Sequence, residues 1–412
     1  INVQATANAY GIFAGAEIDD WYAGRKYGVV EISDCDVTVT STSSYNAYGA
    51  YVSAATRMLN DNTYLQAIKN NNNGKTWYTE SINATEKNTY KYQTGYYGIG
   101  GKMTIKGGTF TANAKTSSAY GVQCAGSCLA GAEEENSIQV VARGELIIYG
   151  GTFNANTTTS NAYGVYSSGT TTIDGGTFNA NATTENAYGA IANRGTMDIT
   201  KGTFNAVTAK TAYGICANGW IDPNTGLHEH AVVTVKGVTV KAQTNSTTTA
   251  YGAIATATNA ELTQAKYDAR SANDKKFYFT ETSDASVSNY YRYRIGSYVE
   301  GGELIVNGGT FTAEAATSTA VGAYAAVSSL VSTATIGRSM YGEGKLTVNN
   351  GMFEVSSGSN MAEGVRSYGQ STINGGQFTI TAKGNTAYGV RALGGKTTVS
   401  DGIFTVTATT NT

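Results

Sequence analysis

The sequence predicts an all-β fold: a three-sided parallel β-solenoid, or β-helix, of about ten coils with helix and hairpin insertions. A short phrase recurs along the 412-residue chain, and the equivalent residues Phe153, Phe178 and Phe204 lie 25 and 26 residues apart. Such a period is typical of repeats that stack on their neighbours. The composition agrees, with 29 Tyr, 50 Gly and only 1 Pro, because Tyr suits a pleated surface whereas Pro cannot donate to the ladder between coils.

Each repeat divides into three predicted strands, and residues 171–191 show them most clearly. The first strand is Thr171–Ile173, and the pair Gly175–Gly176 then bends the chain because glycine tolerates positive φ. The second strand is Thr177–Ala182. A polar corner at Thr183–Asn186 leads into the third strand, Ala187–Ile191.

The alternation along the second strand predicts its buried face. Phe178, Ala180 and Ala182 share one side, which we expect to point inward, while the Asn and Thr residues between them form outward ladders. Tyr188 and Ile191 are expected near the wall, with the face of the tyrosine left open. The predicted core stack comprises Phe110, Phe153, Phe178, Phe204, Phe311, Phe353, Phe378 and Phe404, with Val37 and Val240 at the same place in weaker copies.

A longer repeat divides the chain into two tandem units of five coils, residues 1–203 and 204–403. For example, Phe153 and Phe178 recur as Phe353 and Phe378, 200 residues later. Residues 404–412 then repeat the second-strand position of residues 1–9. The sequence therefore starts and stops within a coil, which would leave open strand edges that can pair with other chains. Residues 404–412 are a candidate joint between subunits.

Two tyrosine-rich arms, residues 54–100 and 255–303, interrupt the coils. We expect each arm to begin with a short helix, at Ala54–Lys69 and Glu261–Arg270, and the first arm to continue into a hairpin with strands near Trp77–Ile82 and Thr89–Tyr97. Tyr and Trp are enriched at interfaces, so the arms are interpreted as lateral contacts between subunits, as carbohydrate-stacking surfaces, or as segments packed on their own coil. The candidate interface residues are Trp77, Tyr78, Tyr90, Tyr92, Phe277, Tyr278, Tyr291 and Tyr293.

The sequence contains no pattern that predicts catalysis or a cofactor. It has neither a G-x-S-x-G nucleophile motif nor a phosphate-binding loop, and we expect no enzyme activity. The two histidines, His228 and His230, are weak candidates for a metal site, but the matching insertion has Tyr27 and Gly28 there, so no metal is predicted. The net charge of -2 disfavours nucleic acid as a partner. No apolar run of about 18 residues predicts a membrane span.

Two kinds of covalent modification are candidates. Cys124 and Cys128 are close enough in sequence to form a small disulfide loop in an oxidising compartment, although all four cysteines could equally be inert buried thiols. The candidate glycosylation sites, each in an N-x-[ST] sequence, are Asn83, Asn156, Asn181 and Asn245.

The stacked coils built around G-G-x-F, for example Gly107–Ala114, Gly175–Ala182 and Gly375–Ala382, resemble right-handed parallel β-helix surface repeat proteins, such as bacterial adhesins and autotransporter passenger domains. The resemblance implies a right-handed coil, secretion to the cell exterior or cell surface, and a role in adhesion or matrix building. It transfers no catalytic residue to this chain.

The function that we expect is that of a structural subunit of an extracellular fibre, filament or surface layer, in which copies of the chain assemble head to tail through open solenoid ends. The alternative is an adhesin or carbohydrate-binding stalk segment of a longer cell-surface protein, with glycans as partners. A polysaccharide-acting β-helix enzyme is disfavoured because no charged cluster is found. An ice-binding face is disfavoured because Lys241 and Glu314 interrupt the outward Thr and Asn rows.

Overall fold

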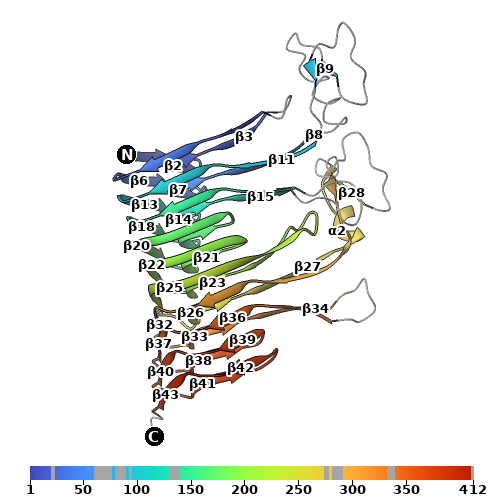
Figure 1. Cartoon of the computed structure of the whole chain (residues 1–412). Coiled ribbons are helices and arrows are strands. Elements are labelled where there is room, and N and C mark those ends of the chain that lie inside the picture. The colour runs from blue at the N-terminus through green and yellow to red at the C-terminus, as the bar shows by residue number, and fades with distance from the viewer. Residues whose placement is uncertain are drawn as a thin grey trace.

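The computed structural model describes residues 1–19, 24–59, 77–78, 90–91, 95–129, 140–272, 278–280, 291–331 and 339–409. The chain winds into a stack of coils, with the labelled N and C ends at opposite ends of the stack (Figure 1). Each complete coil has three strands, each paired in parallel with its equivalent in the neighbouring coils. The predicted all-β parallel solenoid is therefore confirmed.

The three strands of each coil build three faces along the stack. The first face consists of β5 (Val29–Ile32), β12 (Lys102–Ile105), β17 (Glu145–Ile148), β20 (Thr170–Ala182), β22 (Gly195–Thr208), β25 (His228–Thr244), β31 (Glu303–Val306), β36 (Lys345–Val348), β39 (Gln370–Ile373) and β42 (Thr397–Val399). The second face consists of β1 (Asn2–Ala5), β6 (Asp36–Ser41), β13 (Thr109–Ala114), β18 (Thr152–Thr157), then β20, β22 and β25 again, β32 (Thr310–Ala315), β37 (Met352–Ser357), β40 (Gln377–Ala382) and β43 (Ile403–Ala408).

The third face is a separate parallel sheet. It consists of β2 (Ala9–Ala14), β7 (Ala47–Val52), β14 (Ala119–Cys124), β19 (Ala162–Ser167), β21 (Ala187–Ala192), β23 (Ala212–Ala217), β26 (Ala250–Ala255), β33 (Ala320–Ala325), β38 (Ala362–Ser367) and β41 (Ala387–Ala392). The first and second faces instead belong to one bent sheet, because β20, β22 and β25 run through the bend. In β20 the bend includes Gly176 at φ 103°, where glycine is favoured.

Phenylalanine rings stack along the axis inside the solenoid, as predicted. Phe178 lies between Phe153 and Phe204, with ring centroids 4.9 and 4.8 Å away, and the in-register pairs Phe153–Phe178 and Ala155–Ala180 place like residues on one another. The predicted stack is buried except at Phe404, which is half-buried in the outermost described coil and packs on Phe378.

The interior is thin because the third face approaches the phenylalanine column at a glycine. A Cβ atom built on Gly164 of β19 would lie 2.9 Å from the Cβ atom of Phe178 and 2.5 Å from the carbonyl oxygen of Gly189. Real side chains do not fit at such distances. The glycine of the recurring A-Y-G phrase is therefore required for the third face to pack against the phenylalanine of the second face.

The tyrosine of the same phrase points outward and forms a second aromatic stack. In the third face, Tyr163, Tyr188 and Tyr213 stack with centroid distances of 5.0 and 4.5 Å. A neighbouring column includes Tyr166, whose ring meets that of Tyr163 edge to face at 5.3 Å. The face of the tyrosine, left open by the sequence, is therefore the outer surface of the third face.

This tyrosine surface predicts a loss of stability at alkaline pH. Burial raises the pKa of Tyr51, Tyr163 and Tyr324 from 10.0 to about 12. Above pH 10 the unfolded chain loses these protons while the folded chain keeps them, so stability is complete below pH 10 and decreases toward pH 12. The free energy of unfolding decreases by at most about 1.4 kcal/mol per pH unit for each tyrosine that stays protonated in the folded chain. Urea titrations at pH 8, 10 and 11 measure the loss; constant stability together with phenolate absorbance rising near pH 10 would contradict it.

The insertions leave the coils between the third and first faces as antiparallel hairpins, and Figure 1 shows several extending to the same side of the stack. The pairs are β3 (Ala16–Ile18) with β4 (Arg25–Tyr27), β8 (Ala54–Leu59) with β11 (Gly95–Gly100), β15 (Gly126–Leu129) with β16 (Val140–Arg143), β24 (Gly219–Ile221) with the start of β25, β27 (Ala257–Leu262) with β30 (Gly296–Gly301), and β34 (Val327–Val331) with β35 (Ser339–Glu343).

Two expectations about the arms are wrong in the described part of the chain. The helix predicted from Ala54 is strand β8 as far as Leu59, because pairing with β11 supplies its backbone partners; residues 60–69 lie outside the described residues. The hairpin predicted from Trp77 is also not formed, since β9 (Trp77–Tyr78) and β10 (Tyr90–Lys91) pair in parallel. In the second arm the predicted helix is reduced to α2 (Gln264–Asp268), capped by Thr263.

Candidate functional site

The first candidate site is the pair of solenoid ends. Among the described strands, β1 and β2 pair only with β6 and β7. At the other end, β41, β42 and β43 pair only with β38, β39 and β40. Each of these end strands therefore has one edge without a strand partner in the described chain. Apolar side chains are also exposed at both ends: Ile1 is 60% exposed and Ile403 62% exposed.

The two ends match each other in sequence and register. Tyr10 begins the outward tyrosine column, stacked on Tyr48 at 4.8 Å, and Tyr388 occupies the same column at the other end. In the neighbouring column, Phe13 and Arg391 hold equivalent positions. A further coil placed on Tyr388 would continue both columns, because an arginine guanidinium stacks favourably on an aromatic ring.

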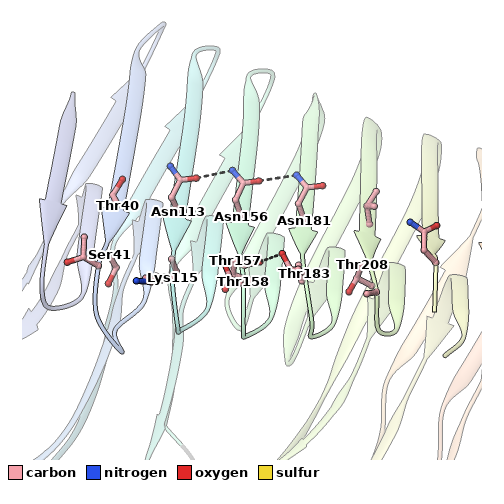
Figure 2. A pocket seen from close by; sticks show the side chains of 16 residues that line it. Thr40, Ser41, Asn113, Lys115, Asn156, Thr157, Thr158, Asn181, Thr183 and Thr208 are labelled. Atoms are coloured by element: carbon pink, nitrogen blue, oxygen red, sulfur yellow. Dashed lines mark hydrogen bonds between the residues drawn. The ribbon is translucent and has the colours of Figure 1, made fainter. Parts of the chain in front are cut away.

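A second candidate is a polar groove along the axis, with a volume of about 640 Å³. Figure 2 shows its ladder of asparagines: Nδ2 of Asn181 donates to Oδ1 of Asn156, and Nδ2 of Asn156 donates to Oδ1 of Asn113, each over 3.0 Å. Amides and hydroxyls repeated at the strand spacing of about 4.8 Å could hydrogen-bond an elongated polar ligand lying along the axis.

The same ladder includes two of the four candidate glycosylation sites. The amide nitrogens of Asn156 and Asn181 already donate within the ladder, so a glycan on either would compete with a ladder bond. Asn245 is exposed and also lines the groove. Asn83 lies outside the described residues.

The histidines line a hollow of about 400 Å³ beside the hairpins. His228 and His230 both lie near Glu300, with Nε2 of His228 4.0 Å and Nδ1 of His230 3.5 Å from its carboxylate oxygens. Glu229 points to the opposite face of the strand and pairs with Arg143 over 3.1 Å. The H-E-H side chains therefore do not converge, and no three His, Cys, Asp or Glu residues in the described ranges form a metal-binding group.

The candidate disulfide between Cys124 and Cys128 is not formed in the structure, where all four cysteines are free thiols. Cys124 ends β14 with its side chain inside the coil, where its thiol donates to the carbonyl oxygen of Gly144 over 3.2 Å. Cys128 lies in the hairpin, where Nη1 of Arg194 donates to its sulfur over 2.9 Å. The two sulfurs contact different residues because the chain leaves the coil between Cys124 and Cys128. Burial raises the pKa of both thiols, that of Cys124 to about 12, which keeps them protonated.

The arms use some of their aromatic residues internally. Tyr293 is buried against Tyr267 and contacts Arg270, which for this residue favours the interpretation that the arm packs on its own chain. Tyr278 packs on the same cluster. Tyr92 and Phe277, and the side chains of Trp77, Tyr78, Tyr90 and Tyr291, lie outside the described part of the structure.

Two charged features were missed from the sequence. Glu363 takes the place of tyrosine in the outward column, is 0% exposed, and pairs with Arg366 and Arg391. Arg194 links two hairpins, because its guanidinium lies 4.3 Å above the ring of Trp220 while it contacts Cys128. The phrase A-E-G at Ala362–Gly364, where other coils have A-Y-G, was a visible signal for the first feature.

The fold and these surfaces define the class of the protein as a parallel β-solenoid. Comparisons with protein-family models, curated proteins and solved structures give no match. Among the described residues, no helix is both long and apolar enough to cross a membrane.

Proposed function

We propose that the chain is a structural subunit of an extracellular fibre, filament or surface layer, in which copies join head to tail so that one solenoid continues into the next. The observation that supports this proposal is the match between the ends, where Tyr388 and Tyr10 belong to the same column and β43 and β1 to the same face. Unpaired strand edges readily accept another strand, and a contact between two different ends propagates into a filament.

Several other features fit a structural role. The outward ladders and the stacked interior repeat along the axis, so the surface is periodic rather than centred on one pocket. The proposed location outside the cell follows the expectation from the resemblance to surface repeat proteins, and no enzymatic step is part of the proposal. The alternative function, an adhesin or carbohydrate-binding stalk, is favoured by one observation, the polar groove along Asn113, Asn156 and Asn181.

Sedimentation velocity over a range of concentrations tests the proposal. We expect the sedimentation coefficient of the chain to rise with concentration. Val406→Lys should remain a single chain at concentrations where the unmodified protein assembles, because Val406 is 43% exposed at the open end and a lysine there opposes strand addition. The matched control is Tyr341→Lys, at an apolar residue 61% exposed on a hairpin, which should assemble normally.

Two outcomes would contradict the proposal. Assembly of Val406→Lys to the same extent as the control would show that the ends are not the joint. A single sedimenting species of the unmodified chain at every concentration would exclude self-assembly and favour the stalk, with the groove as its binding surface.

A further inference from the structure

Two successive turns between the third and first faces carry no hairpin, and a hollow lies beside them. The chain passes from β19 to β20 through residues 168–169 and from β21 to β22 through residues 193–194, whereas the turns before and after carry the hairpins β15–β16 and β24–β25. Thr170 and Thr196, at the start of β20 and β22, line the hollow of about 400 Å³ together with Arg143 of one hairpin and His228 of the other. The hollow is therefore a polar cleft between two hairpins of one chain.

Two hydrogen-bond acceptors face each other in this cleft. Nδ1 of His228 lies 3.2 Å from the carbonyl oxygen of Gly226, which can only accept, so Nδ1 donates and Nε2 of the neutral ring is an acceptor. This Nε2 atom lies 4.0 Å from Oε2 of Glu300, whereas Oε1 of Glu300 accepts from the backbone N–H of Gly301 over 3.3 Å. A donor about 2.9 Å from each atom fits between acceptors 4.0 Å apart, so a group with two or more N–H donors can join them.

The carboxylate of Glu300 also lacks a fixed positive partner. In the described ranges its ion-pair neighbours are only the imidazoles of His228 and His230, while Glu229 pairs with Arg143 over 3.1 Å. The Glu300 side chain is 19% exposed, and salt screens a partly buried charge less than an exposed one. The cleft therefore favours a ligand whose donor group is a cation, and a primary ammonium combines a positive charge with three donors.

A second part of the cleft offers groups suited to hydroxyls. Nη1 of Arg143 and Oε2 of Glu229 are buried and have no hydrogen-bond partner among the described residues, because the pair joins only Nη2 to Oε1. An alcohol hydroxyl can accept from Nη1 and donate to Oε2 once the two side chains turn toward the cleft. The hydroxyls of Thr170 and Thr196 supply further partners. The cleft thus matches a ligand that carries both an ammonium and several hydroxyls.

We infer that this cleft binds a sugar with a free amino group. The ammonium lies between Glu300 and Nε2 of His228, and the ring hydroxyls contact Arg143 and the two threonines. A hollow of about 400 Å³ is at the smaller end of the range for small-molecule pockets, about 300–1,000 Å³, which suits a ligand of the size of a monosaccharide. Binding does not require head-to-tail assembly, since all of these residues belong to one chain.

Isothermal titration calorimetry of the unmodified chain with matched sugars, in the presence of EDTA to exclude a metal bridge, tests the role of the ammonium. Glucosamine should bind at least about tenfold more tightly than N-acetylglucosamine and glucose, which lack the charge. Equal binding of N-acetylglucosamine, or no detectable binding of glucosamine, would overturn the inference. n-Butylamine has an ammonium without hydroxyls and should bind more weakly than glucosamine; binding of equal strength would show that the cleft recognises the ammonium alone and not a sugar.

Two variants that each neutralise one glutamate locate the site. Glu300→Gln should weaken glucosamine binding about tenfold to hundredfold, because it removes the carboxylate that contacts the ammonium. Glu314→Gln is the matched control, since Glu314 pairs with Lys241 on the second face and does not line the cleft, and it should bind glucosamine as the unmodified chain does. Unchanged binding in Glu300→Gln would place the sugar elsewhere on the solenoid and contradict the inference. If Glu300→Gln does not fold, the comparison of the sugars on the unmodified chain still decides the outcome.

Discussion

Replacing Phe178 by alanine is expected to lower the free energy of unfolding by about 3–5 kcal/mol, the usual cost of removing a fully buried aromatic ring. The Phe178 side chain is 0% exposed, and its removal deprives both Phe153 and Phe204 of a stacked ring. The gap cannot close easily, because the facing Gly164 has no side chain to fill it and its backbone already touches the column. Urea unfolding followed by circular dichroism measures the change.

The control is Phe404→Ala in the same column. Phe404 has one stacking partner among the described residues and is half-buried, so its removal should cost clearly less than that of Phe178, measured on dilute, unassembled protein. Equal losses at the two positions, or an unchanged Phe178→Ala variant, would contradict the stacked interior as the main source of stability.

Neutralising Glu363 should be the other strongly destabilising change. The carboxylate is buried and pairs with Arg391 over 2.8 Å and with Arg366. In Glu363→Gln the two guanidinium groups remain close together without a counter-charge, and breaking a buried ion pair on one side costs about 3–5 kcal/mol. We expect the lower end of that range, about 3 kcal/mol, because Arg391 is partly exposed.

Glu354→Gln is the matched control, because Glu354 is an exposed glutamate on β37, the strand that precedes β38 in the chain. Its unfolding midpoint should be unchanged. If Glu363→Gln were as stable as Glu354→Gln, the buried charges would contribute nothing to holding the β38 and β41 coils together, and the account of this cluster would be wrong.

The coils could be predicted because one local rule repeats in each of them. Period-2 alternation fixed Phe178 and Ala180 as inward residues, and the residues were the same in successive repeats, so stacking them in register followed. The A-Y-G phrase did not predict in the same way that Tyr188 points outward. The glycine of the phrase carries no polarity signal, and the need for glycine becomes visible only where Gly164 meets Phe178 in the structure.

The insertions could not be predicted because their structure depends on distant partners. Ala54–Leu59 contains residues that favour helices, but its backbone is paired with Gly95–Gly100 across the whole arm, and tertiary pairing overrides local propensity. The spacing of Cys124 and Cys128 likewise suggested one loop. Instead the first thiol points into the coil and the second lies on a hairpin held by Arg194.

Electron cryomicroscopy of the assembled chain tests the central claim most directly, because it measures how one solenoid follows another. Head-to-tail stacking of about ten coils per copy predicts continuous solenoids with an axial repeat of roughly 50 Å at a strand spacing of about 4.8 Å. Copies associated side by side, with their axes not continuous, would contradict head-to-tail assembly itself.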